Sequence, residues 1–311
     1  KKGLPTEKKQ LQELHRRRAE NYARLGQRTN SANEFRKALA IEHRLDLHQR
    51  LIQELHNSQA KPEEMLPLVN QYLKQYPDRA DRHSMRYYLA AAYLRNKENN
   101  KALPILKELL LVYARPSNVA STFVGTNGNK PEQLQQSEQI LLNAIAKNPE
   151  EAGYLRYVLA FNVQFPLKKV DQGRETLKTL ITQSPTNDGY THGAINWLLS
   201  NAKTYAEFQQ NFQLVVQARK KAPHLSSFRT YLNSWVTSFA RNNRKKELRP
   251  RVNWARKALT AADSDPIIQR WAAISKGNVH KMAVARDVLL APNEFQKLTD
   301  EQAELLLTQQ T

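Results

Sequence analysis

Three histidines, His43, His48 and His56, lie within fourteen residues, which makes them the first place to look for a metal site. Neutral imidazole is a common metal ligand, so the spacing decides the question. On one helix, His48 and His56 would lie about 12 Å apart along the axis, because each residue rises by ~1.5 Å, and one ion cannot bind both. The chain also contains no cysteine, which removes disulfides, thiolate metal sites and cysteine nucleophiles. The sequence therefore predicts no metal site.

The stretch GTNGNK, from Gly125 to Lys130, superficially resembles a phosphate-binding loop. Such a loop needs four residues between its glycines, followed by Lys and then Ser or Thr. Here two residues separate the glycines and Pro131 follows the lysine, so we interpret the stretch as a turn. The motifs of serine hydrolases, zinc proteases and dinucleotide-binding enzymes are also missing from the sequence. We predict a non-enzymatic protein with no catalytic residue and no cofactor.

The most charged stretch of the chain is RNNRKKELRPRVNWARKAL, residues 241–259, with eight Lys and Arg against one Glu. The whole chain has 48 basic and 29 acidic residues, a formal net charge of +19, which attracts polyanions and acidic proteins. We interpret the stretch as an enlarged turn between two helices, whose cations form a candidate anion-binding edge. The residues of this edge are Arg241, Arg244, Lys245, Lys246, Arg249 and Arg251.

Prolines that end helical segments recur along the chain and indicate the elements that position these residues. Amphipathic runs end at Pro77, Pro149, Pro185 and Pro223, and with Pro116 included the successive spacings are 33–39 residues. Proline is common just after a helix because it cannot continue the helix. A helix end at this period predicts a repeated unit of two helices joined by short turns.

The best-defined unit is ENYARLGQRTNSANEFRKALAIEH, residues 20–43, which shows how such a pair would pack. The small side chain of Ala38 allows two helices to approach closely, and the large Tyr22 and Phe35 fill the space between neighbouring pairs. Gly26 ends the first helix, because glycine adopts the left-handed backbone there without a Cβ penalty.

This spacing resembles the tetratricopeptide-repeat superfamily, and residues 87–116 repeat it with Ala90, Tyr93, Ala102 and Leu106. The resemblance implies an all-α fold, a right-handed superhelical solenoid of antiparallel helix pairs. We expect a single array over residues 1–311, whose fourth unit has a shortened or replaced first helix. The expected units are 12–45, 46–79, 83–116, 117–150, 152–186, 189–223, 225–263 and 265–291, followed by a capping helix at about 294–309.

The resemblance also implies that the first helices of the units line a groove for peptide or protein segments. One subclass of the family holds a C-terminal carboxylate with Lys, Arg and Asn at set positions, but only Arg16 matches here. The next positions hold Glu20, Leu51, Ser84 and Tyr88, so that clamp is absent. The alternative interpretation of the groove positions is an ordinary solvated helix face. The candidate groove-lining residues are Arg16, Glu20, Arg24, Arg50, Tyr87, Tyr88 and Arg95.

These features favour a protein–protein interaction scaffold whose partner is a peptide or an acidic protein. The main alternative is RNA or DNA binding by the basic surface with its interleaved aromatic residues. Two further functions stay open. The chain could be an envelope-located solenoid that contacts anionic polysaccharide, or it could be one segment of a larger enzyme. The chain begins at Lys1, so we expect a fragment or a processed product. No apolar run approaches the ~18 residues of a membrane span, and cytoplasm and bacterial envelope are equally compatible with the sequence.

Overall fold

The computed structural model describes residues 6–79, 81–112, 119–147, 149–150, 152–185, 189–222, 235–239 and 247–259. Helix is the sole regular secondary structure of these residues, which confirms the predicted all-α class. The contacts of the chain group it into two compact units, Lys1–Lys147 and Asn148–Thr311. The right-handed superhelix and the single array over the whole chain stay predictions.

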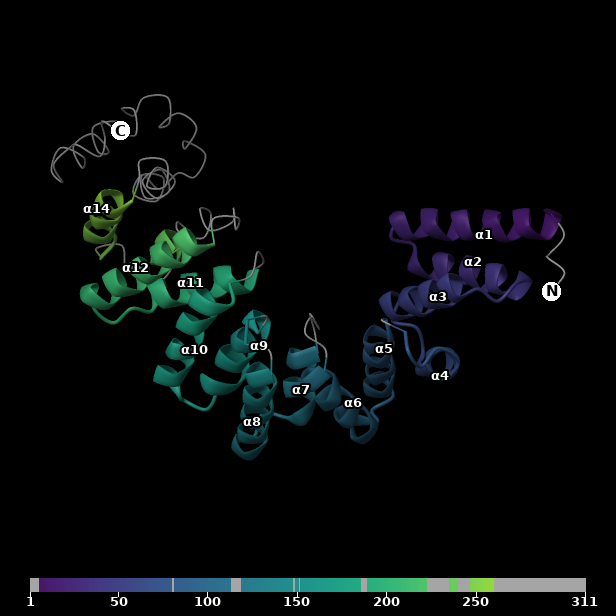
Figure 1. Cartoon of the computed structure of the whole chain (residues 1–311), viewed down its shortest axis with the longest axis horizontal. Coiled ribbons are helices and arrows are strands. Elements are labelled where there is room, and N and C mark those ends of the chain that lie inside the picture. The colour runs from purple at the N-terminus through teal and green to yellow at the C-terminus, as the bar shows by residue number, and fades with distance from the viewer. Residues whose placement is uncertain are drawn as a thin grey trace, which may run out of the picture. The chain divides into compact units, whose positions relative to one another are not determined.

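Unit 1 consists of successive pairs of helices, and the two helices of each pair are joined by a turn of three or four residues (Figure 1). Turns this short make the two helices of a pair antiparallel neighbours. The described part of helix α7 spans nine residues, and the shortened first helix of the expected unit 117–150 stays a prediction. The helices are α1 (Thr6–Arg24), α2 (Arg28–Ile41), α3 (Leu45–Asn57), α4 (Pro62–Gln75), α5 (Arg82–Arg95), α6 (Asn99–Val112), α7 (Val119–Asn127) and α8 (Pro131–Lys147).

Gly26 closes α1 as the sequence predicts, with a positive φ of 74°. Its amide donates to Ala23 O at 3.1 Å, and the amide of Gln27 donates to Tyr22 O at 2.9 Å. These two bonds satisfy carbonyls that the end of a helix would otherwise leave unpaired. The same pair of bonds, with a positive φ, closes α3 at Gln59 and α5 at Lys97. The end of the first helix therefore has the same shape in each of these three pairs.

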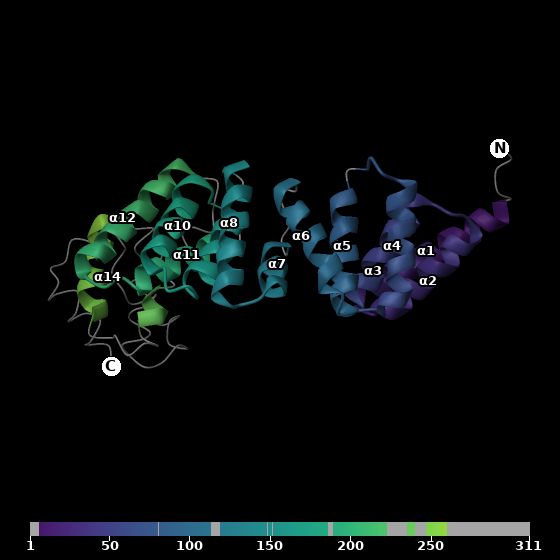
Figure 2. The same cartoon turned by 90° about the horizontal axis from the view of Figure 1, so that it is seen from below.

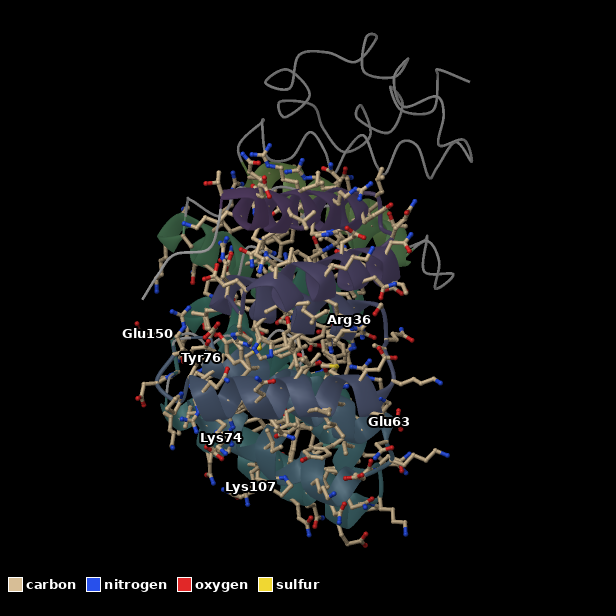
Figure 3. The ribbon with its side chains drawn as sticks, turned by 90° about the vertical axis from the view of Figure 1, so that its right-hand side faces the viewer. Arg36, Glu63, Lys74, Tyr76, Lys107 and Glu150 are labelled. Carbon is tan, nitrogen blue, oxygen red and sulfur yellow. The ribbon has the colours of Figure 1, made fainter. Side chains whose placement is uncertain are left out.

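Small and large apolar side chains alternate in the core of unit 1. Ala19 and Ala38 are fully buried where α1 packs on α2, and Phe35 is 2% exposed beside them. Ion pairs tie the edges of the layers, as between Arg36 of α2 and Glu64 of α4. Figure 3 shows Arg36 and Glu63 on one flank of unit 1, and Lys74 at the other end of α4. The second helices of the first two pairs are thus joined at their edges.

Unit 2 contains a π-helical segment, η1 (Leu159–Gln164), that directly continues its first short helix. Figure 2 shows α10 and α11 alongside each other, and the core beneath is rich in aromatic rings such as Phe208, Phe212 and Trp235. The other described helices are α9 (Gly153–Val158), α10 (Val170–Gln183), α11 (Gly189–Ser200), α12 (Tyr205–Lys221) and α14 (Leu248–Ala258). The expected unit 265–291 and the expected capping helix lie outside the described residues.

Candidate functional site

The seven predicted groove residues lie on the first helices of three successive pairs of unit 1. Arg16, Glu20 and Arg24 are on α1, Arg50 is on α3, and Tyr87, Tyr88 and Arg95 are on α5. The solvent-facing sides of α1, α3 and α5 are called the first-helix face below. The structure brings these residues together in two groups, one between α1 and α3 and the other between α3 and α5.

The first group surrounds a cavity of about 260 Å³, here called the arginine pocket. The buried ring of Phe35 contributes an apolar wall, and the other lining side chains are mostly charged. Three of the predicted groove residues therefore share one pocket. Its lining residues are Glu20, Ala23, Arg24, Phe35, Arg50 and Glu54.

Both acidic side chains of the arginine pocket already have basic partners from outside it. Glu54, whose side chain is 5% exposed, pairs with Arg28 at 3.1 Å. Glu20 pairs with Arg16, which also holds Glu13 at 2.6 Å. The hydrogen bond from Arg16 lowers the pKa of Glu13 to about 2, so this carboxylate stays ionised beside its partner. Arg16 thus neutralises acids of its own helix and is not an open groove cation.

The two remaining cations of the arginine pocket have no carboxylate partner among the described residues. Arg50 is exposed and donates a hydrogen bond to the neutral Gln53 at 3.3 Å. Arg24 is also exposed, and its side chain makes no hydrogen bond or ion pair within the described part of the chain. When Arg16, Arg28 and the Glu13 that Arg16 also holds are counted with the lining residues, four arginines face three carboxylates. This net charge of +1 suits an anionic group in fork-like contact with guanidinium.

The second group is a cluster of three rings, His56, Tyr87 and Tyr88, here called the ring triad. The ring centroid of His56 lies 4.5 Å from that of Tyr88 and 5.9 Å from that of Tyr87, and the two tyrosine rings are 6.2 Å apart. The sequence does not single out His56 as a groove residue. Its partners Tyr87 and Tyr88 lie about thirty residues further along the chain, and sequence spacing does not reveal such a contact. All three side chains are half-buried.

Arg95 lies beside the ring triad and pairs with neutral acceptors. It donates to Ala60 O at 3.0 Å, and its Nη2 lies 3.4 Å from His56 Nδ1. Burial lowers the pKa of Arg95, and burial together with the charge of Arg95 lowers the pKa of His56 to about 4. His56 is therefore neutral at pH 7 and can accept the hydrogen bond from Arg95 at Nδ1.

The predicted anion-binding edge requires one correction. Arg251 is 4% exposed, and its guanidinium lies 5.0 Å from the ring centroid of Phe239 and 5.3 Å from that of Phe208. It also pairs with Glu247 at 3.1 Å. The prediction is wrong for this residue, because its charge is used inside unit 2. Arg241, Arg244, Lys245, Lys246 and the side chain of Arg249 lie outside the described residues.

The described residues hold no group of three His, Asp or Glu side chains that could bind a metal ion. None of the described helices is both long and apolar enough to cross a membrane. No protein-family model matches the chain, and no curated protein matches it. Among solved structures, the chain is similar to the TPR2AB-domain:pHSP90 complex of yeast Sti1, with 11% identity over 74% of this chain and 98% of that chain. The TM-score is 0.31, too low for this likeness to carry an argument.

Proposed function

We propose that this chain is a non-enzymatic scaffold that binds an acidic segment of another protein on the first-helix face of unit 1. The observation that carries the proposal is the arginine pocket. Within the described residues, Arg24 and Arg50 have no carboxylate partner there, while Glu20 and Glu54 are already paired. An Asp or Glu side chain of a partner would supply the missing negative charge. Charge-assisted hydrogen bonds contribute about 1.5–3 kcal/mol each when buried, and about 1–1.8 kcal/mol is expected here because both arginines are exposed to solvent.

The net charge of +19 acts at longer range than the pocket. A positive field speeds the encounter with an acidic partner, and the effect weakens as salt screens it. Short-range contacts at Arg24 and Arg50 would then hold the encountered segment in place. The field explains association rate, and the pocket explains where the segment stays bound.

Fluorescence anisotropy with a labelled peptide of twelve alternating Glu and Ser residues tests the proposal on the full chain. We expect Arg24→Ala and Arg50→Ala each to weaken binding by about five- to twentyfold. Arg17→Ala is the matched control, because Arg17 is a highly exposed arginine of α1 outside the arginine pocket. It should change the affinity less than twofold.

Single-stranded RNA of the same length is the second probe, because diffuse basic surface also binds phosphate. RNA binding by spread charge falls steeply with salt and depends little on any one arginine. The proposal is wrong if the acidic peptide does not bind near physiological salt, or if both pocket variants bind it as the wild type does. Tight RNA binding with no peptide binding would favour a nucleic-acid role instead.

A further inference from the structure

The ring triad and the arginine pocket share helix α3, and none of the three rings lines the pocket. His56 belongs to α3, the same helix that carries Arg50 into the pocket. The half-buried Gln53 lies between them in the sequence. Tyr87 and Tyr88 contact His56 from α5, so a segment that leaves the pocket across α3 toward α5 would meet the three rings.

Two polar atoms of the triad already have partners. His56 Nδ1 faces Arg95, and the Tyr87 hydroxyl lies 3.5 Å from Thr122 Oγ1. Each of the three rings is nevertheless only half-buried. Partly exposed rings with centroids 4.5–6.2 Å apart offer edges and faces to a further ring.

The positive charge of Arg95 beside the triad decides which kind of ligand the aromatic surface can bind. Clusters of rings also bind cations, but Arg95 carries a positive charge at 3.4 Å from His56 and would repel one. Arg95 has acceptors from Ala60, Ala91 and His56 but no carboxylate partner within the described residues. A neutral aromatic side chain is not repelled by Arg95, and an acidic segment that carries it would bring negative charge close to this arginine.

We infer that the ring triad is a second subsite of the first-helix face, which takes an aromatic side chain of the acidic partner. This inference rests on the proposed function. Arg50 and His56 are six residues apart on α3, so they are separated by about 9 Å along the axis at ~1.5 Å per residue. An extended segment advances about 3.3 Å per residue and also crosses the width of α3, so the acidic and aromatic residues should be about three to four positions apart.

Three peptides measured against the full chain test the inference. The first carries an acidic cluster and a Phe four residues beyond it, the second has Ala in place of that Phe, and the third has the Phe directly beside the cluster. We expect the first to bind about tenfold more tightly than either of the others. A ring that enters an aromatic cluster adds both buried area and ring contact.

Variants of the protein locate the effect. Tyr88→Ala should abolish the tenfold preference for the first peptide, and Tyr88→Phe should keep it, because the ring and not the hydroxyl makes the contact. Tyr93→Ala is the matched control, a half-buried tyrosine of the same helix that is outside the triad. If Tyr88→Ala does not fold, Tyr88→Leu takes its place, because it keeps an apolar side chain but removes the ring and should also lose the preference.

The outcomes separate this inference from the proposed function. If all three peptides bind the wild type equally and the Arg24 and Arg50 variants weaken all of them, the inference is wrong and the proposed function stands. If none of the peptides binds, the proposed function fails and the inference fails with it. A preference for the first peptide that persists in Tyr88→Ala also overturns the inference, because the Phe then binds elsewhere.

Discussion

Gly26 and Lys97 hold the same left-handed backbone at the ends of α1 and α5, with φ values of 74° and 59°. The amide after each of them donates to the carbonyl five residues earlier, at 2.9 Å in both turns. One turn uses glycine, which adopts this conformation without cost, and the other uses lysine, which does not. The shape of the turn is therefore kept by the packing of the helix pair and its hydrogen bonds.

Lys97→Gly should stabilise the protein by about 0.5–1 kcal/mol, because the substitution removes the steric cost of a Cβ at positive φ. Urea unfolding followed by circular dichroism would measure the change. Lys107→Gly is the control, since Lys107 is an exposed residue inside α6 and glycine there should destabilise by about 1 kcal/mol. Destabilisation by both substitutions would contradict the assigned strain at Lys97.

These turns show how far the sequence alone predicts the fold. Gly26 marks its turn because glycine is the residue that the conformation favours, and the period of the prolines marks the helix pairs. Gln59 and Lys97 carry no such mark, because tertiary contacts impose their backbone. The all-α class is likewise predictable from the sequence, because it follows from the local pattern of apolar residues and prolines.

The candidate site is predictable from the sequence in part, for a similar reason. Residue type and helix position single out Arg24 and Arg50, and a pocket does bring them together. That Glu54 is already paired depends on Arg28, twenty-six residues away, and sequence spacing does not reveal such a contact. The prediction for Arg251 is wrong because the rings that cover it come from segments distant in the chain.

His56 should make the stability of unit 1 depend on pH. Its folded pKa of about 4 lies below the unfolded value near 6.5, so the unfolded state binds more protons between these values. Stability contributed by this group is present above pH 6.5 and is lost as the pH falls toward 4. We expect a loss of about 1–2 kcal/mol, reduced from the full shift because solvent screens this partly exposed ring.

Urea unfolding of the wild type and of His56→Gln between pH 7 and pH 4 would measure this difference. The carboxylates titrate in both proteins, so only the gap between the two curves reports on His56. His43→Gln is a second comparison, because His43 is an exposed histidine whose ring contacts His48 and not His56. Parallel curves for the wild type and His56→Gln would show that the ring is not held neutral by its surroundings.

Arg251→Ala should destabilise the protein by about 2 kcal/mol, because the stem and guanidinium fill space against buried rings. Arg251→Met keeps the volume of the stem without the charge and should recover at least half of that loss. Urea unfolding of the three proteins would show the order. Equal stability of the wild type and Arg251→Ala would mean that the side chain is not packed in this way.

The remaining predicted anion-binding edge is tested by neutralising Lys245 and Lys246 together. We expect the double alanine variant to fold as the wild type does and to bind single-stranded RNA less tightly. The slope of the logarithm of affinity against the logarithm of salt concentration should decrease by about 1 to 1.5, at ~0.7 for each RNA phosphate that a lysine no longer neutralises. Arg251→Met is the internal control, because its charge lies inside unit 2 and its removal should leave this slope unchanged. An unchanged slope in the double variant would mean that the stretch is a solvated turn without an anion-binding role.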